Sequence, residues 1–308
     1  VHVIDAYRLA AEAGLGRRIN TIMQACFFAL SRLLPTERAL DQIRVAVGKT
    51  YGKQGPDVVS RNIAAIDRAL ARLEVLEPPA SDVGGRHRAP RIPERAPDFV
   101  KRVTAALIAG HGDDLPVSAF PVDGTWPVGT SQWEKRSLAT DIPVWDPTLC
   151  IQCNKCVALC PHAAIRAKVY EPSAGDGAPE GFPAIAWKGT ELAGQSYTLQ
   201  VAPDDCTGCR LCVEVCPAKD KANPRRKALA MQPRPAIRDQ ERERFAFFQL
   251  LPEVSRERVH LDLKGSQLLH PLFEYSGACA GCGETAYVKL LSQLFGDRAL
   301  IANATGCS

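Results

Sequence analysis

Two cysteine runs with the same spacing constrain this chain more than any other feature. Each run reads C-x2-C-x2-C-x3-C-P, so three closely spaced cysteines precede a fourth cysteine and a proline. The first run is Cys150, Cys153, Cys156, Cys160 and Pro161, and the second is Cys206, Cys209, Cys212, Cys216 and Pro217. Each proline prevents the chain from continuing as a regular helix past the fourth cysteine. Two tight, cysteine-lined loops are therefore predicted.

This spacing is typical of bacterial proteins that carry two [4Fe–4S] clusters for electron transfer. Three thiolates wrap one cluster, while the fourth cysteine, three residues further on, ligates the other. The sequence therefore predicts two clusters with crossed ligands. Cluster 1 is assigned to Cys150, Cys153, Cys156 and Cys216, and cluster 2 to Cys206, Cys209, Cys212 and Cys160.

Zinc and disulfides are the other common uses of cysteine. A structural zinc site takes four ligands in a tetrahedron and has no use for the third closely spaced cysteine. Disulfides belong to oxidising compartments and small secreted chains. The chain has 12 cysteines, no apolar stretch as long as a membrane span and no signal peptide at its start. We therefore expect a cytoplasmic, metal-ligating protein that does not bind a membrane.

The length and net charge of the chain limit the number of domains and the classes of partner. A chain of 308 residues is long enough for two or three domains. Its net charge of +4 gives no strong case for nucleic acid as a partner. The chain starts at Val1 and stops at Ser308, in both cases within an ordered-looking pattern. We therefore expect an internal segment of a longer polypeptide.

Composition shifts divide the chain into four stretches. Residues 1–76 have helical apolar periodicity, and the family resemblance described below implies that they are the C-terminal part of an α/β domain. Residues 77–97 are rich in proline, glycine and arginine, which predicts a linker. Residues 98–235 form the predicted ferredoxin-like domain, and residues 236–308 begin another domain. The predicted fold class is multidomain α/β and α+β, with a central two-[4Fe–4S] bacterial-ferredoxin-like domain flanked by partial α/β domains.

Local patterns add detail. Asn20 is predicted to cap a helix whose apolar face includes Cys26 and Leu30, so Cys26 is expected in a core and not as a ligand. An insertion between the two runs contains strand candidates at 184–187 and 197–201. Residues 225–244 are basic, which indicates a helix with local ion pairs or a docking patch for an acidic electron carrier.

A third cysteine constellation lies near the end of the chain. Cys279 and Cys282 are separated by two small residues, and Cys307 follows later. Three cysteines are one short of a cubane or a four-cysteine zinc site. Spacing alone leaves a third [4Fe–4S] cluster, a zinc ion and unligated cysteines open, with any fourth ligand outside the chain.

Several strings together resemble the pyruvate:ferredoxin (flavodoxin) oxidoreductase family. The similar stretches are INTIMQACFF at 19–28, GTSQWEKR at 129–136, CPHAAIR at 160–166, CPAKDK at 216–221, SGACAGCGE at 276–284 and ANATGCS at 302–308. The resemblance implies that Cys279, Cys282 and Cys307 hold a third [4Fe–4S] cluster. It also implies that residues 236–308 begin a thiamine-diphosphate-binding domain, in which Glu284 and Thr305 lie against the cofactor.

The resemblance implies a reaction for the full-length protein. Pyruvate and coenzyme A become acetyl-CoA and carbon dioxide, with Mg²⁺-bound thiamine diphosphate carrying the chemistry. The clusters pass electrons to ferredoxin or flavodoxin, and the full-length protein is expected to be a homodimer. The 308 residues alone are not expected to decarboxylate pyruvate, and no catalytic residue is visible in them. A stand-alone enlarged ferredoxin, or a relative acting on another 2-oxoacid, is the alternative.

Overall fold

The computed structural model describes residues 1–78 and 92–302. The chain divides into two compact units, Val1–Arg88 and Ala89–Ser308, which are described separately below. The boundary between them falls outside the described residues, as does most of the predicted 77–97 linker. Within the described parts, no helix combines the length and the apolar character needed to cross a membrane.

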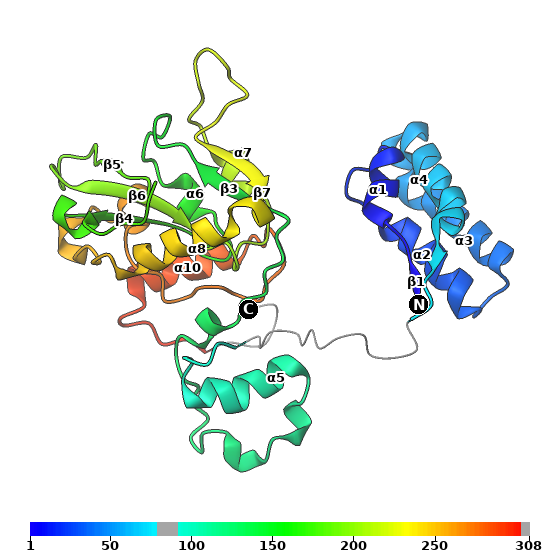
Figure 1. Cartoon of the computed structure of the whole chain (residues 1–308), viewed down its shortest axis with the longest axis horizontal. Coiled ribbons are helices and arrows are strands. Elements are labelled where there is room, and N and C mark those ends of the chain that lie inside the picture. Colours follow the sequence, from blue (N-terminus) through cyan, green and yellow to red (C-terminus); the bar gives the residue numbers. More distant parts are fainter. Residues whose placement is uncertain (79–91, 303–308) are drawn as a thin grey trace. The chain divides into compact units, whose positions relative to one another are not determined.

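The first unit is a small helical bundle closed by a two-stranded ribbon (Figure 1). Strand β1 (His2–Val3) pairs antiparallel with β2 (Glu74–Val75), so the two ends of the unit meet. The helices of this unit are α1 (Ala6–Glu12), α2 (Asn20–Ser31), α3 (Thr36–Tyr51) and α4 (Pro56–Ala69). Helix α2 packs on both α3 and α4.

The apolar faces of these helices form one core. Ile22, Ile43 and Ile66 are buried in it, and Cys26 is 3% exposed, as expected for a core cysteine. The predicted Asn20 cap is wrong: Ile19 is the N-cap, because its carbonyl accepts the first helical hydrogen bond, from Met23. Leu30, expected on the apolar face, is 43% exposed, because the C-terminal end of α2 is less covered by the other helices than its middle.

The second unit begins with a helical turn beside the cysteine-containing part. A π-helical segment, Val100–Thr104, runs directly into α5 (Ala105–Ala109). Its apolar side packs with Ile92, Ala96 and Trp133 in a small separate core. The helices in the following stretch to residue 140 are short 3₁₀ turns, and most of its residues are exposed.

Two antiparallel sheets build the centre of this unit. Strand β3 (Asp141–Trp145) pairs with β7 (Leu229–Pro233). Strand β4 (Ile165–Tyr170) pairs with β6 (Ser196–Val201), and β5 (Ile185–Ala186) adds to the other edge of β6. The strands predicted at 184–187 and 197–201 are therefore confirmed. They pair with each other, with Ile185 opposite Tyr197.

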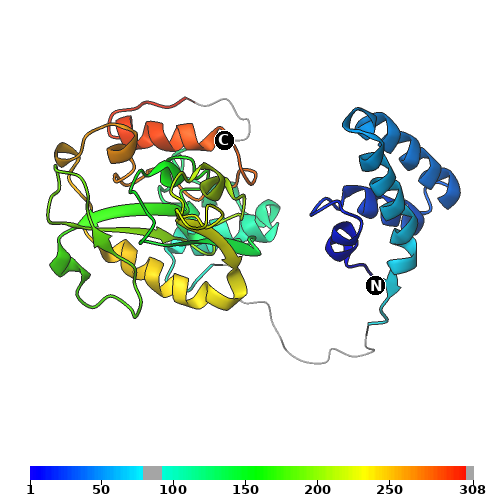
Figure 2. The same cartoon turned by 90° about the horizontal axis from the view of Figure 1, so that it is seen from above.

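Helices cover these strands. Short helices α6 (Lys155–Ala158) and α7 (Leu211–Val215) pack together, and α8 (Arg234–Leu250) lies on β6. Helices α9 (Leu263–Ser266) and α10 (Thr285–Phe295) follow. Seen from above, α8 and α10 lie on opposite sides of the strands (Figure 2). The mixed helices and sheets give a multidomain α/β protein.

One core runs through the second unit and past residue 236. Trp145 and Tyr197 from the strands share it with Phe248 of α8 and with Tyr275. Helix α8 begins at Arg234 and so spans the boundary predicted at 235/236. The functional division at that point stays a prediction, but the two sides of it pack as one body.

Candidate metal centre

The first cysteine loop owes its shape to two residues in the left-handed region. Gln152 has φ 58° and Asn154 has φ 55°, values that L-residues adopt only at special turns. This conformation folds the chain tightly between Cys150 and Cys153, and the Gln152 amide donates a hydrogen bond to Cys150 Sγ at 3.3 Å. Helix α6 starts directly after Asn154 and carries Cys156.

The second loop repeats this geometry at the equivalent positions. Gly208 and Arg210 both have φ 69°, and the Gly208 amide donates to Cys206 Sγ at 3.4 Å. Helix α7 follows and carries Cys212. A Cβ atom at Gly208 would lie 3.2 Å from the Asp141 carbonyl oxygen, so this position also needs a residue without a side chain. The matching φ angles and N–H···S bonds make the two loops structural repeats.

The fourth cysteine of each run joins the loop of the other run. Two small pockets, with empty volumes near 330 and 340 Å³, separate the eight cysteines into two sets of four. We call them the first and second cysteine sets, and they have the crossed composition that the spacing predicts. The first set is Cys150, Cys153, Cys156 and Cys216, and the second is Cys206, Cys209, Cys212 and Cys160.

Burial dominates the electrostatics of these thiols. It raises the pKa of Cys150, Cys156 and Cys212, and it raises the pKa of Cys206 to about 12. Neighbouring cysteines raise these pKa values further, and for Cys156 the largest of these contributions comes from Cys212 of the second set. Negative charge on the sulfurs therefore needs a compensating positive group within each set, which is the property of a metal-ligand site.

The donor chemistry fits iron–sulfur clusters. Four thiols line each pocket, and a backbone amide already donates to one sulfur of each set. Among residues 1–78 and 92–302, no three cysteine, histidine or carboxylate side chains are grouped closely enough to hold a single metal ion. Each set surrounds a space, as the ligands of a multi-atom cluster do.

Buried polar side chains fix the first loop in place. Gln152 donates from Nε2 to the Ala186 carbonyl oxygen at 2.7 Å and accepts from the Lys188 amide at 2.8 Å. The Tyr197 hydroxyl donates to Asn154 Oδ1 at 2.8 Å, and Tyr197 is fully buried. The insertion between the cysteine runs thus supports the first loop. Sequence analysis missed these residues, because nothing local marks partners so distant in the chain.

The third cysteine pair lies against the second set. Gly281, between Cys279 and Cys282, has φ 77°, and a Cβ there would lie 3.7 Å from Cys209 Cβ. His162, just after Cys160, has its Nδ1 3.1 Å from the Ser276 carbonyl oxygen. Gly281 therefore lies close to Cys209 of the second set, and the segment just before the Cys279–Cys282 turn lies against His162.

The predicted ligands of the third site are only partly described. Cys279 is exposed and Cys282 is half-buried. Hydrogen bonds from the amides of Thr285 and Glu284 lower the pKa of Cys282, because it sits at the start of α10. Glu284 is exposed, as the residue before α10. Cys307 and Thr305, which were predicted as a cluster ligand and a thiamine contact, lie outside the described residues.

Comparison with known proteins identifies relatives of this chain. Residues 1–72 match the family model for pyruvate ferredoxin/flavodoxin oxidoreductase, and residues 149–219 match a 4Fe-4S dicluster domain. Residues 85–139 match a domain of unknown function. The chain is 54% identical over its whole length to the probable pyruvate-flavodoxin oxidoreductase of Escherichia coli. Over its whole length, the chain is therefore similar to part of pyruvate-flavodoxin and pyruvate:ferredoxin oxidoreductases.

Other relatives give the same result. The chain is 52% identical to a putative pyruvate-flavodoxin oxidoreductase of Synechocystis over its full length, and 48% identical to the pyruvate:ferredoxin oxidoreductase of Moorella thermoacetica over 99% of it. The aligned region is 26% of each of these relatives. The chain therefore spans about a quarter of the length of the relatives it matches.

Proposed function

We propose that this chain is the electron-relay segment of a thiamine-diphosphate-dependent pyruvate:ferredoxin/flavodoxin oxidoreductase. In the whole enzyme, pyruvate and coenzyme A give acetyl-CoA and carbon dioxide, and two electrons leave one at a time. The observation that carries the proposal is the pair of matched four-cysteine pockets within a chain that has these relatives. The many free thiols fit a reducing compartment, so the cytoplasm is the proposed location.

The first and second cysteine sets are the proposed ligands of two [4Fe–4S] clusters. When bound, the clusters supply one-electron transfer at potentials that hydrogen bonds to sulfur and burial set. The protein contributes the Gln152 and Gly208 amides, which donate to Cys150 and Cys206. It also excludes water, because Cys156 and Cys212 are less than 10% exposed.

A third [4Fe–4S] site is proposed at Cys279, Cys282 and Cys307, with a fourth ligand from outside these 308 residues. The closeness of Gly281 to Cys209 supports it, because a relay needs neighbouring sites. A stand-alone ferredoxin has no need of such a site. Glu284 and Thr305 remain the proposed contacts of thiamine diphosphate and its Mg²⁺. Coenzyme A binding and a homodimer are proposals for the full-length enzyme.

Replacing Cys153 with Ala in the full-length enzyme tests the relay. We expect loss of about four of the irons held by the two central sites, because one set is left with three ligands. Pyruvate-dependent flavodoxin reduction should stop while thiamine diphosphate still binds. Cys26→Ala is the matched control, because Cys26 is buried away from both sets, and it should keep its iron. Flavodoxin reduction at the normal rate in Cys153→Ala would refute the relay assignment.

A further inference from the structure

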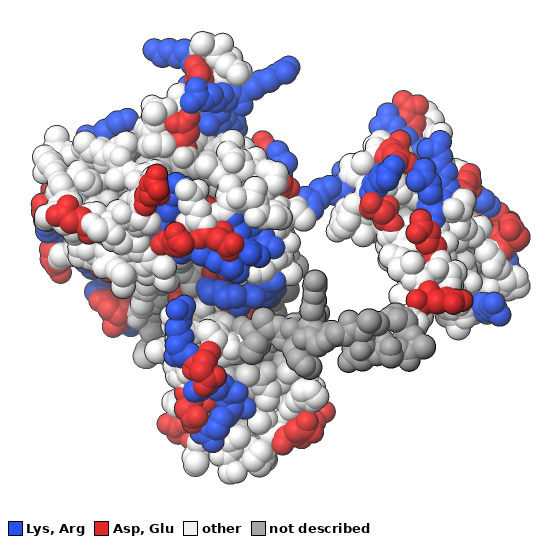
Figure 3. Space-filling view, in the orientation of Figure 1, with Lys and Arg blue, Asp and Glu red and all other residues white. Residues whose placement is uncertain are grey.

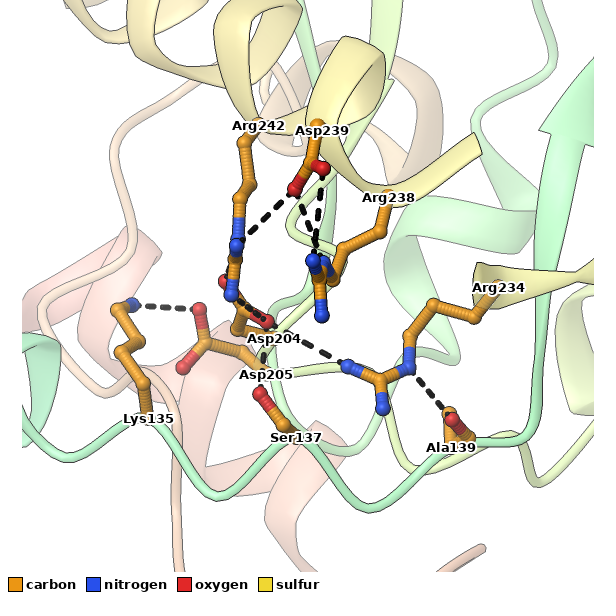
Figure 4. Close-up of polar contacts among 9 residues, drawn as sticks. All are labelled: Lys135, Ser137, Ala139, Asp204, Asp205, Arg234, Arg238, Asp239 and Arg242. Atoms are coloured by element: carbon orange, nitrogen blue, oxygen red, sulfur yellow. Dashed lines mark hydrogen bonds and ion pairs between the residues drawn. The ribbon is translucent and has the colours of Figure 1, made fainter. Parts of the chain in front are cut away.

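The basic segment predicted at residues 225–244 includes most of α8 and the end of a hairpin that precedes it, residues 217–228, and these two elements have different roles. On α8 the arginines are neutralised (Figure 4). Arg242 donates to both carboxylate oxygens of Asp204, at 2.6 and 2.9 Å, and Arg238 pairs with Asp239 at 2.9 Å. Arg234 donates to the Ala139 carbonyl oxygen at 2.7 Å. Arg234 and Arg242 hold α8 on the body of the unit, and Arg238 pairs within the helix, so the three leave little free charge for a partner.

The other part is a projecting hairpin between α7 and β7, residues 217–228 (Figure 1). Its base is regular. The Ala228 amide donates to the Ala218 carbonyl oxygen at 3.1 Å, and the backbones of Lys219 and Lys227 form an antiparallel β-bridge. At its tip, Asn223 accepts from the Arg226 amide at 2.9 Å and closes a turn. The hairpin is therefore a defined structure that extends from the surface.

This hairpin is strongly basic, with five cationic side chains and one carboxylate. Two cations are used inside the unit. Arg226 pairs with Asp146 at 2.6 Å, and Lys227 Nζ donates to the Val213 carbonyl oxygen at 2.7 Å. The other three are exposed and make no ion pair within the described parts of the chain; they are Lys219, Lys221 and Arg225. Figure 3 shows the basic side chains extending from this hairpin into solvent.

The base of the hairpin packs against the first cysteine set. Ala218 and Ala228 share a small buried cluster with Cys216 and Cys150. The neighbouring Ile151, inside the first loop, is 52% exposed. The hairpin that carries the three exposed cations is therefore anchored at its base on the first set, next to a loop residue that reaches solvent.

We propose that this hairpin docks a small acidic electron-carrier protein of the flavodoxin type beside the first cysteine set. The inference rests on the proposed relay function and adds where the carrier binds. The first set would hold the cluster that gives up one electron in each encounter, and the carrier's cofactor would accept that electron. Complementary charge steers such encounters and raises association rates by about 10- to 1000-fold at low salt.

The test uses the full-length holoenzyme with the triple change Lys219→Gln, Lys221→Gln and Arg225→Gln. The probes are a purified flavodoxin and a small dye that accepts electrons without docking. We expect kcat/KM for flavodoxin to fall about tenfold at low ionic strength, mainly through KM, because steering is lost. The salt dependence should flatten, while dye reduction and iron content stay unchanged.

A matched control removes three exposed cations from the first unit, with the changes Arg38→Gln, Lys49→Gln and Lys53→Gln. It should leave flavodoxin kinetics unchanged. Equal kinetics for the hairpin variant and this control would overturn the docking site. Loss of binding to immobilised DNA with unchanged flavodoxin kinetics would overturn it in favour of a nucleic-acid surface. An unmodified enzyme that reduces neither flavodoxin nor dye with pyruvate would defeat the proposed function itself.

Discussion

Lys289 shows how one residue of the last module supports the cysteine sites. Lys289 lies on α10, and its buried ammonium donates to the carbonyl oxygens of Val157 and Ala158, the latter at 3.0 Å. These carbonyls end α6, between Cys156 and Cys160. Burial lowers the pKa of Lys289 to about 8. The Val157 carbonyl also accepts from the Cys160 amide at 3.3 Å, so Lys289 adds a charged donor at the C-terminal end of α6.

Lys289→Met tests this role, because methionine keeps the apolar stem and removes the donor. The two carbonyls lose a charged partner, while the cost of burying the ammonium also disappears. We expect unfolding free energy to fall by about 1–2 kcal/mol, on the scale of a charged hydrogen bond. The readout is urea unfolding followed by tryptophan fluorescence, since all four tryptophans lie in the second unit.

The exposed Lys53 provides the comparison for this experiment. Lys53→Met removes the same charge from the first unit, where the side chain is solvated. It should leave the fluorescence-detected transition in place. An equal shift for both variants would mean that the Lys289 hydrogen bonds contribute nothing specific.

At the scale of elements, the two cysteine loops are the repeated unit of the protein. Their left-handed residues fall at equivalent positions, and each loop leads into a short helix that carries the third cysteine. The loops differ in what surrounds them. Gly208 approaches the Asp141 carbonyl oxygen of β3, whereas the equivalent Gln152 uses its side chain to contact the insertion.

Gly208→Ala should therefore damage the second loop selectively. A left-handed alanine costs about 1–2 kcal/mol, and its Cβ would also press on the Asp141 carbonyl oxygen at 3.2 Å. We expect reduced loading of the second set, seen as a fall toward about four irons from about eight. Gly194→Ala separates the two effects, because Gly194 has φ 84° but open space around it. Full iron content in Gly208→Ala would show that the contact is tolerated.

Sequence spacing predicted the loops and the crossed grouping of cysteines, because a short repeated motif fixes both. The two strands of the insertion could also be predicted, the second from the alternation of Tyr197, Leu199 and Val201. The hydrogen bonds that hold the loops in place could not be predicted from the sequence. Tyr197 reaches Asn154, and Lys289 reaches α6, across long stretches of chain. Such contacts depend on the tertiary fold and leave no local pattern.

Across the whole molecule, neighbouring sites form a sequence within the second unit. Gly281 of the Cys279–Cys282 turn lies close to Cys209 of the second set, and α7, which carries Cys212, packs on α6 of the first set. The hairpin packs against the first set. This order agrees with a relay that begins at the last module and ends at a basic docking element. The helical first unit has a core of its own.

The most direct test of this account is the iron and acid-labile sulfide content of the chain, purified anaerobically, with spectra before and after dithionite reduction. The account predicts about eight irons and eight sulfides in the two central sites, and an absorbance that bleaches on reduction. Bound zinc, or iron without labile sulfide after careful reconstitution, would contradict the cluster assignment and the relay function with it.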